Sequence, residues 1–140
     1  MSNDKDRRSD ASRELSRLEK ACEALLYLSE TDAPVIPFQG PAVDEVTAEE
    51  ILQIAGRDED EPIEEIAVHD LFRKLRTEHE WFSTDQRKNA KRFAALEQLI
   101  SETLEDIHVF RVGRIRIDIF VAGIDEDGRL AGVRTFAVET

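Results

Sequence analysis

VFRVGRIRIDIFVAGIDEDGRLAGVRTFAVET, residues 109–140, decides the fold of this chain. Apolar residues alternate with other residues along its centre, at Ile115, Ile117, Ile119 and Val121. A period of two is typical of a β-strand, because successive side chains point to opposite faces of a sheet. Gly113 and the pair Asp127-Gly128 supply turn residues between the apolar runs. The stretch therefore predicts three antiparallel strands.

These predicted strands also carry apolar groups on their second face, at Phe120, Ala122, Phe136 and Val138. A sheet that is apolar on both faces must be covered on both, and helices upstream in the chain can supply that cover. We therefore expect an α+β fold, a three-layer α/β/α sandwich around a mixed, mostly antiparallel sheet.

Upstream, apolar residues recur at helical spacing from Leu15 to Leu26, which predicts an amphipathic helix that ends near Leu28. Pro34 and Pro37 then hold an extended segment, either an edge strand or an ordered loop. The longest helix is expected after a capping box formed by Ser83 and Gln86. Its wide apolar stripe consists of Ala90, Phe93, Leu96, Leu99, Ile100 and Leu104.

Shorter elements lie between these two helices. Thr47 and Glu50 match the capping box of a short helix that Gly56 can close. A strand is expected after Pro62, and Asp70 is expected to cap a helical segment that continues to Phe82.

A chain of 140 residues is the usual size of one domain. Residues 1–10 are polar and mixed in charge, so we expect a flexible leader there and a single domain over residues 11–140. Neither an export signal nor an apolar run of the ~18 residues that span a membrane is present, so we expect a cytoplasmic location without membrane contact. Cys22 is the single cysteine, which leaves no disulfide and no thiolate metal cluster.

The formal net charge is −12, and nearly all of the excess lies in residues 30–65, where twelve acidic residues face Arg57 alone. Such a field repels nucleic acid and attracts basic proteins, so we expect a basic protein partner and no direct nucleic acid binding. A solvated acidic rim without a partner is the alternative.

Catalytic and metal-binding motifs are weak. His79-Glu80-Trp81 lacks the second histidine of a zinc protease motif, and Asp125 to Gly128 lacks the alternating frame of a calcium loop. Cys22 lies on an apolar helix face, which favours an inert core thiol. We expect a binding protein, not an enzyme, with no cofactor and no metal of its own. A hydrolase that uses some of the many acidic residues is the alternative.

Three stretches together resemble the nuclease A inhibitor family, in the same order and with similar spacing: ALLYLSE (24–30), EWF (80–82) and GRLAGVRTFAVET (128–140). The resemblance covers the chain from about Leu15 to its last residue. It implies a pathogenesis-related-1-like (PR-1-like) α/β/α sandwich, no catalysis, and one-to-one capture of a basic, magnesium-dependent, sugar-nonspecific DNA/RNA endonuclease.

The resemblance also assigns roles by position. Glu30 matches a glutamate that enters the nuclease's catalytic cleft and engages its Mg²⁺, Thr140 matches a threonine beside it, and Trp81 matches a tryptophan at or near the binding surface. Thr31, Asp32 and Glu139 complete the expected partner-binding set. Alternatives are a solvated Glu30, a disordered Thr140 and a core Trp81.

One stretch departs from the family pattern: TDAPVIPFQG (31–40) replaces an aromatic-rich loop after the glutamate. Another nuclease of the same metal-dependent class is therefore a possible target. The rival function is an acidic interaction or regulatory module that binds some other basic protein.

Overall fold

The computed structural model describes residues 3–139, with side chains from Arg13 onward. Its described part is a mixed α+β fold with four helices and seven strands. In chain order these are α1 (Asn3–Cys22), β1 (Leu26–Tyr27), β2 (Ala33–Pro34), β3 (Ile36–Ala42), α2 (Ala48–Ala55), β4 (Ile63–Ile66), α3 (Val68–Arg76), α4 (Thr84–Thr103), β5 (Glu105–Val112), β6 (Arg116–Ile124) and β7 (Arg129–Val138). The predicted flexibility of residues 1–10 stays a prediction.

The main sheet has five strands in the order β3-β7-β6-β5-β4, and every neighbouring pair is antiparallel. The three strands predicted from residues 109–140 are confirmed as β5, β6 and β7, which form its centre. The proline-bracketed segment enters the edge strand β3, and β4 after Pro62 forms the opposite edge. A separate two-stranded sheet consists of β1 and β2.

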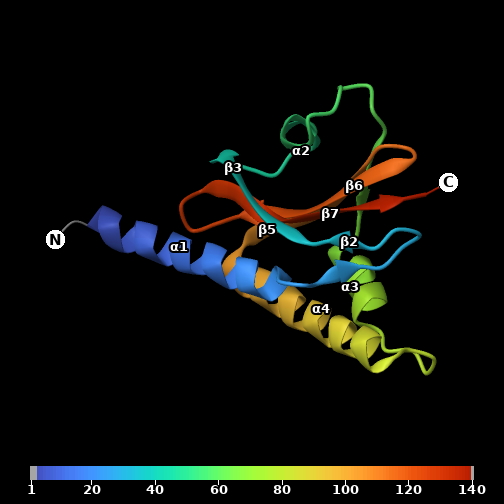
Figure 1. The fold of residues 1–140 in the computed structure, drawn as a ribbon. Coiled ribbons are helices and arrows are strands. Elements are labelled where there is room, and N and C mark those ends of the chain that lie inside the picture. Colours follow the sequence, from blue (N-terminus) through green and yellow to red (C-terminus); the bar gives the residue numbers. More distant parts are fainter. Residues whose placement is uncertain (1–2, 140) are drawn as a thin grey trace.

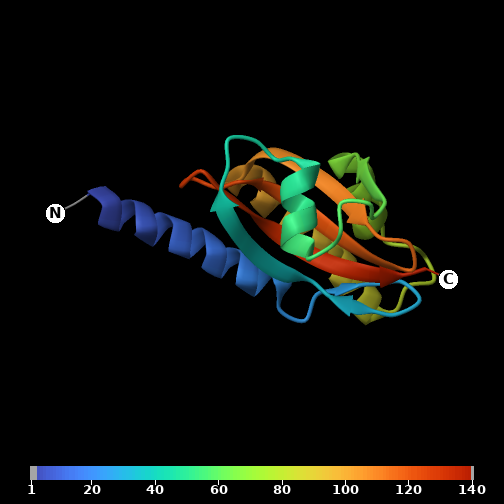
Figure 2. The same ribbon diagram turned by 90° about the horizontal axis from the view of Figure 1, so that it is seen from above.

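Helices cover both faces of the main sheet (Figure 1). On one face, α2 buries Ile51 against a cluster that includes Phe120 and Leu130. On the other face, α1, α3 and α4 bury a larger cluster that includes Phe93 and Ile119. Seen from above, α2 lies over only part of its face (Figure 2). The apolar groups predicted on both faces are thus explained by burial on both.

Two of the three predicted helix starts are confirmed. The Ser83 hydroxyl oxygen accepts a hydrogen bond from the Gln86 backbone N–H (3.1 Å), and the Gln86 side chain accepts one from the Ser83 N–H (2.8 Å). Thr47 caps α2 by accepting from the Glu50 N–H (3.3 Å). The third prediction was wrong at both ends of α3: its N-cap is Ala67 without a side-chain cap, and Asp70 lies in its first turn. Burial of Leu71 and Phe72 accompanies this earlier start, and Asp70 still complements the helix dipole. The helix ends at Arg76 and does not continue to Phe82, because the backbone of Thr77 is extended (φ −73°, ψ 124°).

The predicted end of the first helix near Leu28 was also wrong, because α1 ends at Cys22. Ala24 adopts a left-handed conformation (φ 55°), which turns the chain out of the helix. Beyond it Leu25 and Tyr27 are buried whereas Leu26 and Leu28 are exposed, which is the alternation of a strand. The run of leucines suited both periods, and tertiary burial selected the strand.

Glu14 joins α1 to the turn between β6 and β7. Burial, a hydrogen bond with Glu126 and the negative charges of Glu126 and Asp125 raise the pKa of Glu14 to about 7, against an opposing effect of Arg17. Because the folded state holds this proton more tightly than the unfolded chain, the stability contributed by Glu14 is fully present below its ordinary pKa and is lost as pH rises through about 7.

We therefore predict that the free energy of unfolding falls between about pH 4.5 and about pH 7, and that Glu14→Gln removes part of this fall. Urea denaturation at several pH values measures it. Glu19→Gln, at an exposed position of the same helix, is the matched control. Equal pH slopes for Glu14→Gln and the native chain would contradict the prediction.

Candidate functional site

Three segments that are distant in the sequence meet at one end of the molecule (Figures 1 and 2). They are the connection between β1 and β2, the connection between α3 and α4, and the end of β7. A surface groove links the first two, since Leu28 and Ser29 line it together with His79, Trp81 and Phe82. The fold thus brings Glu30, Trp81 and Glu139 to the same end, while Thr140 lies outside the described residues.

Glu30 lies at the tip of the β1–β2 hairpin, where Leu26 pairs with Pro34 and Tyr27 with Ala33. The tip is a compact turn, because the Ser29 hydroxyl donates to the Thr31 carbonyl (2.8 Å) and accepts from the Thr31 N–H (3.3 Å). Glu30, Thr31 and Asp32 are all exposed. The carboxylate of Glu30 is thus carried by a closed hairpin turn and not by the end of a helix.

Side chains from two other elements hold this hairpin. On α4, the Asn89 amide donates to the Leu26 carbonyl (2.8 Å) and accepts from the Leu26 N–H (3.1 Å). On β7, the Thr135 hydroxyl donates to the Pro34 carbonyl (2.9 Å). Asn89 therefore satisfies both peptide groups of Leu26, as a neighbouring strand would. Both hairpin strands are tied to the body of the domain.

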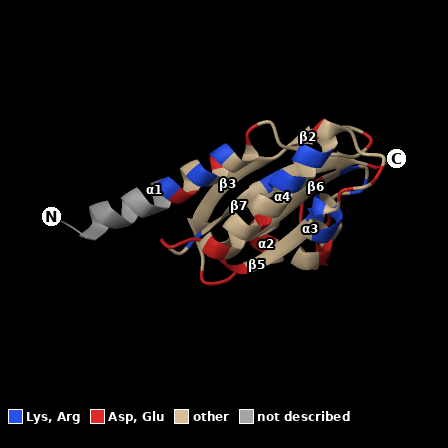
Figure 3. Cartoon of the chain, turned by 90° about the horizontal axis from the view of Figure 1, so that it is seen from below, with Lys and Arg blue, Asp and Glu red and all other residues tan. Residues whose placement is uncertain are grey.

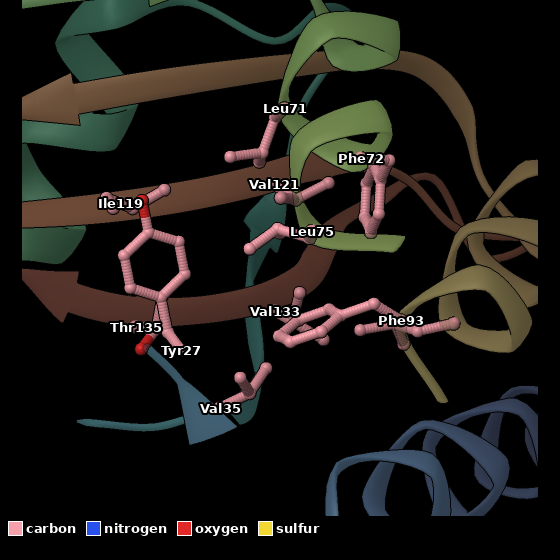
Figure 4. Close-up of a pocket in the computed structure, with 11 residues that line it drawn as sticks. Tyr27, Val35, Leu71, Phe72, Leu75, Phe93, Ile119, Val121, Val133 and Thr135 are labelled. Atoms are coloured by element: carbon pink, nitrogen blue, oxygen red, sulfur yellow. The ribbon is translucent and has the colours of Figure 1, made fainter. Parts of the chain in front are cut away.

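Apolar packing fixes the base of the hairpin. Tyr27 and Val35 point into the core beside Phe93 and Val133 (Figure 4). The cavity among these side chains is about 20 Å³ and apolar, close to the size of a single water. A densely packed base leaves the hairpin little room to shift.

Trp81 is 77% exposed, so the alternative of a core tryptophan is wrong. Its ring stacks on His79 with a centroid distance of 4.4 Å and an interplanar angle of 12°. Phe82 meets the Trp81 ring edge-on at 6.3 Å. These contacts orient a large aromatic surface at the rim of the groove, which has a volume of about 390 Å³.

The end of β7 is tied to the body of the domain. Glu139 forms an ion pair with Arg111, and its backbone N–H donates to the Ile115 carbonyl (2.8 Å). Burial raises the pKa of the Tyr27 hydroxyl. The positive charge of Arg111 lowers this pKa and the negative charge of Glu139 raises it further, so the three side chains are neighbours. Glu139 thus lies beside the base of the hairpin.

Among the described residues, no group of three or more His, Cys, Asp or Glu side chains is arranged to hold a metal ion. The described helices also include none that is long and apolar enough to cross a membrane. Cys22 is buried, and burial raises the pKa of its thiol to about 11, which fits the inert core thiol expected from the sequence.

Charge is distributed unevenly over the two helical layers. Asp44, Glu45, Glu49 and Glu50 line a groove at the start of α2, within the acidic segment 30–65. Lys and Arg residues lie along α1, α3 and α4 on the opposite side (Figure 3).

The ring of His108 lies between two carboxylates, Asp106 at 2.8 Å and Glu65 at 3.2 Å. Burial alone lowers the pKa of His108, but these two carboxylates raise it above its ordinary value.

Comparison with known families gives a match over nearly the whole chain. The family model described as nuclease A inhibitor-like protein matches residues 12–140. Comparison with curated proteins gives no significant match.

Asn89 generates a prediction about the hairpin. Asn89→Ala removes two hydrogen bonds to Leu26, which contribute about 1–3 kcal/mol together, and should loosen β1 while the main sheet stays folded. Hydrogen exchange at the Leu26 amide and proteolysis within residues 28–32 should both accelerate. Gln98→Ala, an exposed position on the same helix, is the control. Unchanged exchange at Leu26 in Asn89→Ala would show that the amide does not hold the hairpin.

Proposed function

The chain belongs to the nuclease A inhibitor-like family, and we propose that it inhibits a sugar-nonspecific, metal-dependent endonuclease. Glu30 enters the active site of the nuclease, and its carboxylate engages the catalytic Mg²⁺. The observation that carries this proposal is the position of Glu30, exposed at the tip of a hairpin that Asn89 and Thr135 tie to the domain.

The chemistry of magnesium supports this role for a carboxylate. Mg²⁺ is a hard cation that prefers oxygen ligands and keeps several waters, so one carboxylate can occupy the position of a substrate phosphate oxygen. The nuclease supplies the metal, and the inhibitor supplies one ligand and performs no catalysis.

Rigidity supports the proposal in a second way. A loop that must order on binding loses conformational entropy, which weakens the complex. The Ser29 turn, the Asn89 amide and the packed base at Tyr27 and Val35 restrict the hairpin before the partner arrives. Glu30 therefore reaches the metal with a smaller entropic cost than a glutamate on a free loop.

Further contacts surround Glu30 in the proposed complex. Thr31 and Asp32 share its turn, Thr140 and Glu139 follow from β7, and Trp81 offers the large aromatic surface that is typical of interface hot spots. A nuclease that binds polyanions is basic around its cleft, so the acidic segment 30–65 accelerates association in a one-to-one complex.

We extend the proposal to architecture and location. The helices on both faces of the sheet form the three-layer, PR-1-like sandwich of the family, which presents the hairpin at one end. A buried, single cysteine is compatible with a reducing compartment, and we propose action in the cytoplasm.

We predict that Glu30→Gln weakens inhibition by roughly 100-fold or more, as expected for a hot spot of about 3 kcal/mol, because the neutral amide is a poor ligand for Mg²⁺. Protection of plasmid DNA from purified nuclease A measures the effect. Glu49→Gln, at an exposed acidic position on α2, is the matched control. Capture of basic proteins without any inhibition of the nuclease would instead support the rival function, an acidic interaction module. The acidic groove lined by Asp44 and Glu45 is the observation that favours this rival.

Thr140 gives an independent test. A flexible extension fused after Thr140 should weaken inhibition at least tenfold, because it crowds the site around Glu30. The same extension fused before Met1 is the control. Full inhibition with the C-terminal extension would place Thr140 outside the interface.

A further inference from the structure

α2 lies over only part of one face of the main sheet (Figure 2), and toward the hairpin that face carries side chains that are exposed or half-buried. In the register of β6 and β7, Phe120 is opposite Arg134 and Asp118 is opposite Phe136, so these side chains share one face. Ile36 on β3 is opposite Arg134 and is 51% exposed. We call Ile36, Arg116, Arg134 and Phe136 the Arg–Phe patch.

Both arginines of the Arg–Phe patch lie over aromatic rings. The Arg116 guanidinium carbon is 4.2 Å from the centroid of Phe136, and that of Arg134 is 4.7 Å from the centroid of Phe120. A guanidinium stacked on a ring keeps the N–H groups at its edge available and has fewer conformations to lose. The patch therefore presents two oriented, planar hydrogen-bond donors.

Within residues 13–139, the positive charge of the Arg–Phe patch is only partly neutralised. Among these residues, Arg134 forms no ion pair. Asp118 is buried and its closest cation is Arg57, at 3.1 Å, whereas Arg116 is 3.8 Å away. On a protein with a formal charge of −12, this is a local cationic surface whose natural complement is a carboxylate.

The Arg–Phe patch is continuous with the proposed site around Glu30. Ile36 begins β3, immediately after the β2 strand of the hairpin, and Phe136 lies near the end of β7. A specific protein interface buries roughly 800 Å² on each partner, far more than one hairpin turn offers. A nuclease that encloses Glu30 must therefore extend over neighbouring surface, and this patch adjoins the hairpin on the sheet side.

We propose that the Arg–Phe patch is a second part of the nuclease-binding surface and takes a carboxylate-bearing segment of the nuclease, with Ile36 packed against an apolar group beside that carboxylate. This inference rests on the proposed function. It adds a contact in which the inhibitor is the cationic partner, whereas at Glu30 it is the anionic one. The two contacts of opposite sign fix the orientation of the nuclease on the inhibitor.

A pair of substitutions at one exposed position tests the sign of the occupant. Ile36→Glu places a carboxylate in the patch and should weaken binding to nuclease A at least tenfold, mainly through faster dissociation. Ile36→Lys keeps an aliphatic stem for the apolar contact and adds a cation beside the carboxylate, so it should bind as well as the native chain or better. Equal loss for both variants, or no loss for either, would overturn the proposal. Thermal denaturation checks that both variants stay folded.

Removing the guanidinium groups gives a second test. Arg116→Gln/Arg134→Gln should weaken binding about tenfold, and the loss should shrink as salt is raised because the contact is electrostatic. Lys20→Gln/Arg73→Gln removes the same charge from exposed positions on α1 and α3 and should change little. Equal effects of the two double variants would contradict a local contact.

Glu30→Gln measured beside these variants separates the two proposals. If Glu30→Gln weakens binding but neither Ile36→Glu nor Ile36→Lys changes it, the inhibitor function stands and the Arg–Phe patch lies outside the interface. No binding of the native chain to nuclease A overturns both proposals for this nuclease.

Discussion

The amide of Asn89 satisfies both peptide groups of Leu26, and the presentation of the hairpin depends on this constraint. The chain leaves α1 at Cys22 and has only a few residues in which to reach its exposed turn. Beside α4, the N–H and C=O of Leu26 find no backbone partner, because the peptide groups of a helix bond to one another. The amide supplies those partners, and the buried side chains of Leu25 and Tyr27 then fix the direction of the hairpin.

From this constraint the arrangement of the exposed end follows. The hairpin lies between the main sheet and the connection that carries Trp81, so two kinds of surface flank Glu30. On the helical side there is an aromatic rim and a groove, lined in part by Lys74 and Gln86. On the sheet side there are arginines stacked on aromatic rings. An acidic tip between an aromatic and a cationic surface is a pattern that a single, asymmetric partner can match and a uniform polyelectrolyte cannot.

The sequence predicted the central sheet well because a period of two over residues 109–140 is typical of strands, and apolar groups on both of their faces call for a layer on each face. It failed at ALLYLSE because Leu25 and Leu26 suit a helix and a strand equally, and only contact with α4 and β7 decides between them. Asp70 was misplaced for a related reason, since α3 starts at Val68 without a side-chain cap. For Trp81 the sequence left exposure open, because exposure depends on how His79 and Phe82 stack beside it. Asn89 and Thr135 gave no signal, since one amide in a helix and one hydroxyl in a strand look like ordinary surface residues until the hairpin lies against them.

Engagement of a nuclease metal by the Glu30 carboxylate is measurable as a coupling free energy in a thermodynamic cycle. The affinity for nuclease A is measured by calorimetry with Mg²⁺ and after its removal, for the native chain and for Glu30→Gln. We expect that removing Mg²⁺ weakens the native complex by roughly 100-fold and leaves the Glu30→Gln complex nearly unchanged, because either change alone already removes the coupling between carboxylate and metal. An identical dependence on Mg²⁺ for the two chains would show that Glu30 does not engage the metal.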